Sequence, residues 1–354
     1  MDGGRLLLGQ AAVIFDRLLD RIRGKAVTIP PLDGAFRPNA ALEECEAVAA
    51  ATAPDNLCSD GRCVFYSSEN QLRRLEDGAV VSRHDAPVAA IAASPAGDLA
   101  VALDDGRLFF AERQIVMPDG FFCPTALAFG PDGSLFVAQG SRRHRPSDWV
   151  VDLLEKNAHG SLWRIAPVTG DVACIAQDLA FPGGLACDGD TVVATESWRH
   201  RLIRLRPHRT PEPVLALLPG YPGRLASAAD GGFWLALFAP RNRLIEFVLA
   251  DDAYRAAMMR EVPREHWIAP ALSSGESFLE PLQCGAVRTM GIHKPWSPTR
   301  SYGLVARLDA HFRPIESFHS RAGGRRHGVT SVVQAGTGAL VTAKGGNAIL
   351  QIRS

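Results

Sequence analysis

The sequence predicts an all-β chain folded as a six-bladed β-propeller, with an N-terminal helix and two lid insertions over the mouth of its central channel. One observation is a repeated pattern of short apolar strands, whose six copies begin at Pro54, Pro87, Pro124, Pro182, Pro222 and Val329. The second is their spacing, mostly about 33 to 40 residues, close to the blade repeat of about 40 to 50 residues. A radial array of four-stranded sheets leaves only short edges exposed.

The strands within each copy follow a fixed order. An apolar first strand leads into a turn rich in Asp and Gly, a second strand follows, and a third strand ends in Arg-Leu or a near equivalent, as in Arg201–Leu205. Turns of this composition favour hairpins. The sixth copy has only three strands, so we expect residues 28–50 to supply its fourth strand and close the ring. The propeller is therefore assigned to residues 28–354.

Residues 1–27 are predicted to form a separate amphipathic helix. Ile14, Leu18 and Ile22 recur at helical spacing. Asp16 and Arg17 interrupt the apolar run, so the sequence predicts neither a signal peptide nor a transmembrane segment. Docking on the propeller and peripheral membrane contact both remain open for this helix.

Composition argues against a nucleic-acid-binding protein, and cysteine usage indicates a reducing compartment. Lys and Arg total 38, as do Asp and Glu, and no long run of like charge suggests nucleic-acid binding. The 7 cysteines lack metal-type spacing, which favours free thiols in a reducing compartment and a cytoplasmic protein. Cys58 and Cys63 flank a tight turn, and the sequence leaves open whether they are bonded.

Two long intervals between copies predict the lid insertions, at about residues 141–159 and 240–301. Ser147 begins a segment that predicts a capped short helix. Loops of this length are usually functional or disordered, and tryptophans such as Trp149 and Trp267 argue against disorder. These side chains either attach the insertions to the propeller or line a pocket beneath them.

The topology predicts which side chains meet at the channel mouth. First strands lie innermost, and the chain returns along the second strand to the same face. Candidate site residues at or near the starts of first strands are Asp55, Asn56, Thr125, Tyr221, Arg224, His327 and Ser331. Candidates after second strands are Ser141, Glu196, Trp198 and His200, and Asp104 and Lys344 occupy loops of the same kind.

Several motifs in this chain are similar to those of a known family. They are Gly160-Ser-Leu-Trp-Arg-Ile, Phe181-Pro-Gly-Gly-Leu, Glu196-Ser, Leu218-Pro-Gly-Tyr-Pro and Asp230-Gly-Gly-Phe-Trp-Leu-Ala-Leu. On these residues the chain resembles the strictosidine synthase-like branch of the gluconolactonase and paraoxonase superfamily of calcium-dependent phosphotriesterases, from about Leu32 to its end. The resemblance implies a six-bladed propeller with a site for a small organic molecule at its channel mouth.

The resemblance also raises the question of a metal ion. Calcium-bearing relatives place an acidic residue at the first strand start and Asn or Asp at later ones. Asp55 matches the first position, but Gly183 and Gly223 stand where side-chain ligands are expected. Calcium takes about six to eight oxygen ligands, so we expect no catalytic calcium and no cofactor. Plant strictosidine synthases have Pro-Gly-Gly at the same place in their pattern as Pro182-Gly-Gly in this chain.

Acid and base catalysis is assigned to histidine. The plant enzymes look to a glutamate at the start of the last blade, and the matching stretch here offers His327 instead. Histidine titrates near neutral pH and can serve as acid or base. His327 is the first candidate and His200 the second, with Glu196 or Asp55 as carboxylate partner. A structural hydrogen bond is the alternative role for each of them.

Arg224 would place a fixed positive charge in the channel. It could clamp a substrate carboxylate or polarise a carbonyl, or it could pair with Asp55 and fill the place of the metal. The other residues expected to bind substrate are Asn56, Thr125, Trp198, Tyr221, Ser331 and Ser141.

The sequence therefore predicts a metal-independent, strictosidine synthase-like enzyme that acts on a small organic molecule by acid and base catalysis. Lactone or ester hydrolysis and lyase-type chemistry at a C–N or C–C bond are both open. The alternative is a non-catalytic propeller that binds small molecules or serves as a scaffold and has lost the family metal site.

Overall fold

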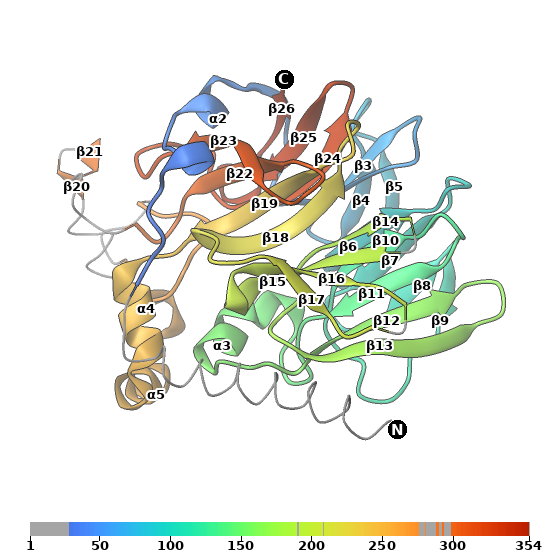
Figure 1. Ribbon diagram of the computed structural model, residues 1–354, viewed down its shortest axis with the longest axis horizontal. Coiled ribbons are helices and arrows are strands. Elements are labelled where there is room, and N and C mark those ends of the chain that lie inside the picture. Colours follow the sequence, from blue (N-terminus) through green and yellow to red (C-terminus); the bar gives the residue numbers. More distant parts are fainter. Residues whose placement is uncertain are drawn as a thin grey trace.

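The computed structural model describes residues 28–353 except 190, 208, 276–279, 281–287, 290–291 and 294–298 (Figure 1). The predicted helix of residues 1–27 lies outside the described residues, so neither its docking nor its membrane contact is tested. The described strands form six four-stranded antiparallel sheets and one two-stranded ribbon. The six sheets are arranged as a propeller, which confirms the predicted fold.

Strands follow chain order within each of the first three blades. Blade one contains β2 (Pro54–Ser59), β3 (Val64–Ser68), β4 (Gln71–Arg74) and β5 (Val80–Arg83). Blade two contains β6 (Val88–Ala93), β7 (Leu99–Leu103), β8 (Leu108–Phe110) and β9 (Arg113–Ile115). Blade three contains β10 (Pro124–Phe129), β11 (Leu135–Gln139), β12 (Gly160–Ala166) and β13 (Asp171–Leu179).

The next two blades repeat this arrangement, and the last one closes the ring. Blade four contains β14 (Leu185–Asp188), β15 (Thr191–Glu196), β16 (Arg201–Leu205) and β17 (Glu212–Leu215). Blade five contains β18 (Gly220–Ser227), β19 (Phe233–Pro240), β22 (Gly303–Leu308) and β23 (Pro314–Ser320). Blade six contains β24 (Val329–Ala335), β25 (Gly338–Ala343), β26 (Ala348–Ile352) and β1 (Glu46–Ala50).

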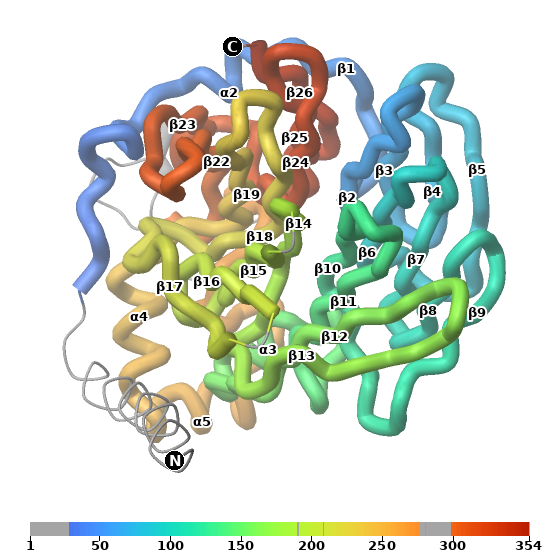
Figure 2. Tube along the Cα trace, turned by 45° about the vertical axis from the view of Figure 1, so that its right-hand side comes forward, coloured from blue at the N-terminus to red at the C-terminus, as the bar shows by residue number. Residues whose placement is uncertain are grey.

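The N-terminal strand closes the ring as the sequence predicts. β1 pairs antiparallel with β26, Glu46 opposite Gln351 and Ala50 opposite Ala348. Each first strand contacts the first strand of the next blade, and β24 contacts β2. The six first strands therefore surround the channel in the middle of the molecule (Figure 2).

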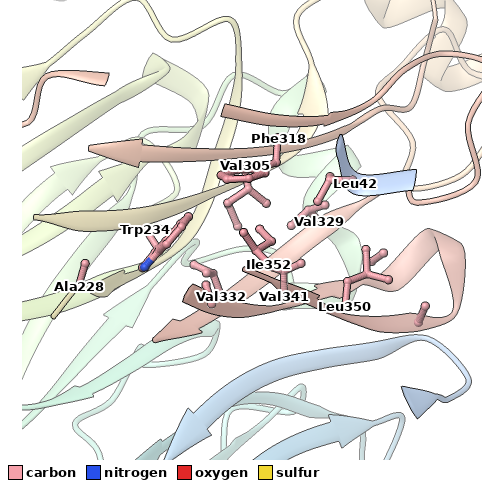
Figure 3. Close-up of a cluster of buried hydrophobic side chains, with 14 residues drawn as sticks. Leu42, Ala228, Trp234, Val305, Phe318, Val329, Val332, Val341, Leu350 and Ile352 are labelled. Carbon is pink, nitrogen blue, oxygen red and sulfur yellow. The ribbon is translucent and has the colours of Figure 1, made fainter. Parts of the chain in front are cut away.

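Apolar side chains fill the space between neighbouring blades. Figure 3 shows this for blades five and six, where Trp234, Val305 and Phe318 face Val332 and Val341. These residues alternate along their strands with side chains on the opposite face, the period-two pattern of a sheet. Packing between blades, in addition to hydrogen bonds within them, therefore fixes the geometry of the channel.

Both long intervals carry helices. Between β11 and β12 lie η2 (Pro146–Asp148) and α3 (Trp149–Leu154). Between β19 and β22 lie α4 (Arg243–Ala250), α5 (Asp252–Glu261), η4 (Arg264–His266) and the ribbon β20 (Arg288–Thr289) and β21 (Ile292–His293). Leu154, Val248, Met258 and Trp267 form one buried cluster, so α3, α4 and α5 pack together on one side of the propeller (Figure 1).

The remaining short elements are η1 (Gly34–Phe36), α2 (Ala41–Glu44), η3 (Ser197–Arg199) and η5 (Lys344–Gly346). Across the part of the chain that the structure describes, no helix is both long and apolar enough to cross a membrane. Cys58 and Cys63 are free thiols.

The predicted helix cap in the first insertion is not made. The Asp148 side chain accepts no bond from the start of α3 and instead accepts one from Arg264 Nη1 at 2.6 Å. Asn242 does cap α4, accepting a bond from Leu244 N at 2.8 Å. The carboxylate of Asp148 is therefore used to join the two insertions.

Candidate functional site

A cavity of about 320 Å³ lies at the channel mouth. The inner strands of five blades line its base, and residues of both insertions line it from above. Its principal lining side chains are Asp55, Val88, Asp104, Thr125, Ser147, Trp149, Phe181, Arg224, Phe238, Leu272, Thr330 and Lys344. Three of the predicted site residues, Asp55, Thr125 and Arg224, are among them.

Backbone irregularities at the starts of the inner strands shape this cavity. Ala89, Thr125 and Thr330 each stand as an extra residue between two paired positions of β6, β10 and β24. A β-bulge leaves its extra residue outside the ladder, so the carbonyl groups of these residues are available to the channel. Asn56 stands at the same irregularity in β2.

Arg224 binds those carbonyl groups. Its Nη2 donates to Ala89 O at 2.7 Å and to Thr125 O at 3.3 Å, and its Nη1 donates to Thr330 O at 3.4 Å. Nη1 also donates to Asp55 Oδ1 at 2.9 Å. One guanidinium thus contacts oxygen atoms from four blades and links their inner strands across the channel.

Asp55 is held between two cations. Lys344 Nζ donates to Asp55 Oδ2 at 2.8 Å, on the carboxylate oxygen that Arg224 leaves free. Burial by itself would raise the pKa of Asp55, but the charges of Arg224 and Lys344 oppose burial and bring that pKa well below its usual range. The carboxylate is therefore ionised at neutral pH and does not supply a proton. We call Asp55, Arg224 and Lys344 the charged cluster.

The prediction from sequence did not single out Lys344. It follows a second strand, as expected for a channel-mouth residue, but it stands in the short run Ala343-Lys-Gly-Gly, which contains no recognisable motif. Gly345 explains its fixed position, since a Cβ there would lie 2.0 Å from Leu272 O of the second insertion. Only glycine permits this close approach of the insertion to the Lys344 loop.

Aromatic side chains form one wall of the cavity. Trp149 meets Phe238 edge to face, with ring centroids 5.3 Å apart, and both line the cavity with Phe181. Trp198 stands behind this wall, stacked on Phe181 at 4.4 Å, and its Nε1 donates to Asp152 at 2.7 Å. Trp198 therefore supports the wall, whereas Trp149, which sequence alone could not assign, faces the cavity.

The first insertion is fastened over the cavity by Asp104. Its Oδ1 accepts a hydrogen bond from Ser147 N at 2.8 Å, and its Oδ2 accepts one from Ser147 Oγ at 2.9 Å. Asp104 is buried at the end of β7. The contact therefore joins blade two to the part of the two insertions that lines the cavity through Ser147 and Leu272, which we call the roof. The sequence placed Asp104 on the channel-mouth face, but no motif indicated that Ser147 would be its partner.

Glu196 lies outside the cavity lining. It is fully buried and accepts hydrogen bonds from Arg199 at 2.6 Å, from Arg201 at 2.5 Å and from Ala180 N at 2.9 Å. These bonds tie the end of β15 to η3 and to the loop before β14. The geometry is that of a buried structural ion pair.

The two candidate histidines are also placed away from the lining. His327 Nε2 donates to Arg321 O at 2.9 Å, and its Nδ1 accepts from Ser301 Oγ at 2.8 Å. His200 is buried beside Tyr221, with ring centroids 4.6 Å apart. Burial, with the Arg241 charge, brings the pKa of His200 well below its usual value, so it is neutral at physiological pH.

The four remaining candidates are buried around the channel. Asn56 Nδ2 donates to Ser67 Oγ at 2.8 Å, and Ser331 Oγ accepts from Leu57 N at 2.8 Å. Ser141 Oγ accepts from two backbone N–H groups of the following turn. The Tyr221 hydroxyl is fully buried and lacks a hydrogen-bond partner among the described residues. None of the four contributes to the lining.

The residues at the channel mouth do not fit a calcium ion. Gly183 and Gly223 line the cavity without side-chain oxygens, and a Cβ at Gly183 would lie 2.8 Å from Ser197 Oγ. Of the two carboxylates in the described lining, Asp55 pairs with two cations and Asp104 accepts two hydrogen bonds from Ser147. Within the described ranges, no three His, Cys, Asp or Glu side chains converge on a point that could hold a metal.

Sequence comparison supports the resemblance inferred above. Residues 126–206 match the family model of strictosidine synthase. Strictosidine synthase-like 13 of Arabidopsis thaliana is 26% identical over 197 residues, which cover 54% of this chain and 43% of that protein. The matched region therefore spans less than half the length of this relative.

Comparison with solved structures supports the fold. A gluconolactonase from Xanthomonas campestris aligns with a TM-score of 0.54 and 12% identity, covering 88% of this chain and 90% of its own. The calcium-binding protein regucalcin from Agrobacterium tumefaciens aligns with a TM-score of 0.50 and 15% identity, covering 84% and 85%. At these identities the likeness concerns the fold alone.

Proposed function

We propose that this chain is an enzyme that acts, without a catalytic metal ion, on a small organic molecule bound in the channel-mouth cavity. The observation that carries the proposal is the charged cluster, in which Lys344 and Arg224 from different blades converge on one carboxylate beside an apolar cavity. Cavities that are mostly apolar with a few convergent polar groups are typical of small-molecule sites.

Lys344 is the residue to which we assign the chemistry. An ammonium group in a partly enclosed cavity stabilises negative charge that develops on a substrate oxygen. Such charge arises in lactone or ester hydrolysis and also when a C–N or C–C bond next to a carbonyl is made or broken. Asp55 holds Lys344 in place and is itself bound by Arg224. His327 lies outside the lining and is bonded to Ser301, so we assign it no direct contact with the substrate.

The roof supports an enzymatic role. Ser147 and Leu272, one from each insertion, line the cavity from above. Closing a site in this way excludes bulk water, and the interaction of a fixed charge with a substrate oxygen is stronger where water is excluded.

Turnover of a panel of lactones and esters by wild type, Lys344→Met and Lys156→Met tests the proposal. Lactones come first because the fold is shared with a gluconolactonase. Lys156 follows α3, pairs with Asp252 and is absent from the cavity lining, which makes it a matched loss of one positive charge. Lys344→Met is expected to lower kcat/KM about 100-fold, and Lys156→Met is expected to leave it within about twofold. Equal activity in Lys344→Met and wild type would overturn the assignment.

The second candidate function is a binding protein without catalysis. It is favoured by the placement of Glu196, His200 and His327 in structural hydrogen bonds. Calorimetry and recovery of the ligand separate the two functions. A binding propeller is identified if a ligand binds to wild type, binds more weakly to Lys344→Met, and is recovered chemically unchanged.

A further inference from the structure

We propose that the ligand of this cavity is an anion, a carboxylate or similar oxyanion joined to a flat apolar body, with Lys344 binding the charged oxygen. This inference rests on the proposed function, because it specifies the molecule for the same cavity. It is carried by the charge balance of the cluster, by the partners of Asp104 and by the shape of the wall.

The charged cluster has an excess of one positive charge. Two cations, Arg224 and Lys344, pair with the single carboxylate of Asp55, and each cation takes a different oxygen. Nη1 and Nη2 of Arg224 also donate to three backbone carbonyl groups, and its Nε is buried away from the cavity solvent. Within the described chain, Lys344 Nζ has one hydrogen-bond partner, which leaves donors for a ligand because an ammonium group carries three.

The excess charge faces the solvent side of the cluster. The Lys344 side chain is 33% exposed, whereas those of Arg224 and Asp55 are 19% and 13% exposed. A ligand that enters the cavity therefore meets the ammonium group more readily than the carboxylate behind it.

The second carboxylate of the cavity does not cancel this preference. Both oxygens of Asp104 accept hydrogen bonds from Ser147. These bonds occupy two of the about four lone-pair positions of the carboxylate. Asp104 is buried, whereas the Lys344 side chain is 33% exposed. Lys344 is therefore the charged group that an entering ligand reaches more readily.

The aromatic wall of the cavity favours a ligand whose apolar part is flat. Trp149, Phe181 and Phe238 line the cavity with aromatic side chains, and Val88 and Leu272 line it with aliphatic ones. Aromatic rings pack against one another in stacked or edge-to-face arrangements with centroids about 4.5 to 7 Å apart. A flat aromatic or conjugated body fits this wall, and the cavity of about 320 Å³ has room for one or two fused rings.

Three probes of one shape test the inference: 2-naphthoate, 2-naphthamide and 2-naphthylmethylammonium, titrated calorimetrically into the full chain. We expect the acid to bind at least about tenfold more tightly than the amide, the ammonium probe to bind more weakly than both, and the preference for the acid to decrease at high salt. Lys344→Met should abolish the preference, Lys344→Arg should retain it, and Lys156→Met should leave it unchanged.

The outcomes separate this inference from the proposed function. If amide and acid bind equally to wild type, or if Lys344→Met keeps the preference, the anion assignment is overturned while a small-molecule cavity remains. Tightest binding of the ammonium probe would overturn it as well and would point to Asp104 as the charged contact. If none of the probes binds and no lactone or ester is turned over, both the inference and the proposed function are refuted.

Discussion

Replacing Arg224 with methionine should destabilise the propeller strongly, because the guanidinium links four inner strands. The variant keeps an unbranched apolar stem but loses the guanidinium group, and with it the ion pair with Asp55 and the bonds to three bulge carbonyl groups. Breaking a buried ion pair by removing one partner costs about 3 to 5 kcal/mol. Since the Arg224 side chain is 19% exposed, we expect a loss at the lower end, about 3 kcal/mol in the free energy of unfolding.

Urea unfolding followed by tryptophan fluorescence measures this loss, with Asp55→Asn and the double variant completing a cycle. Asparagine removes the buried charge that Arg224 compensates, so Arg224→Met should cost less in the Asp55→Asn background. We expect a coupling energy of about 2 kcal/mol. A cost of Arg224→Met below about 1 kcal/mol, or strictly additive effects, would refute the view that this guanidinium neutralises Asp55 and ties the inner strands together.

Three further predictions concern residues away from the charged cluster. Glu196→Gln should lower the free energy of unfolding by about 3 kcal/mol, because it removes the buried charge that Arg201 pairs with; urea unfolding measures it, and an unchanged midpoint contradicts it. Ser147→Ala should leave stability within about 1 kcal/mol but weaken ligand binding, because it removes one of the two bonds that hold the roof to Asp104; unchanged affinity would contradict the role of the roof. Burial, with the Arg321 charge, lowers the pKa of His319 to about 4, so between pH 6.5 and 4 the unfolded chain binds a proton that the folded chain does not. Stability should fall by about 1.4 kcal/mol per pH unit as the pH drops through that window, and a His319→Gln variant with the same slope would rule out this source.

The fold could be read from the sequence because each blade repeats a local signal. The continuous apolar runs within Leu99–Leu103 and Thr191–Glu196 indicate strands buried on both faces, and the Asp- and Gly-rich turns indicate the hairpins. Each of these signals depends on a few neighbouring residues. The fourth strand of blade six was predicted on a different ground, the presence of only three strands in the last copy. It was expected within residues 28–50, and residues 46–50 supply it.

The site could be predicted only in part. Sequence placed Asp55 and Arg224 on the same channel face, and the structure brings them within 2.9 Å. Glu196, His200 and His327 have the residue types expected for catalysis, but their side chains bind Arg199, Gly220 and Arg321, which lie 3, 20 and 6 positions away in the chain. Residue types at these spacings do not show whether such bonds form, because the conformation of the intervening loops decides it. The direction of a side chain at a strand end depends on such partners and not on its own position in the repeat.

The sequence by itself determined a ring of six blades, the face on which the channel opens, and the absence of side-chain oxygens at Gly183 and Gly223, because periodicity and residue identity are local properties. Only the tertiary structure decided that Lys344 joins Asp55 and Arg224, that Trp149 faces the cavity, and that Asp104 holds the roof. These contacts join residues separated by tens to hundreds of positions, and the packing of blade against blade sets their distances. No local pattern encodes such a distance.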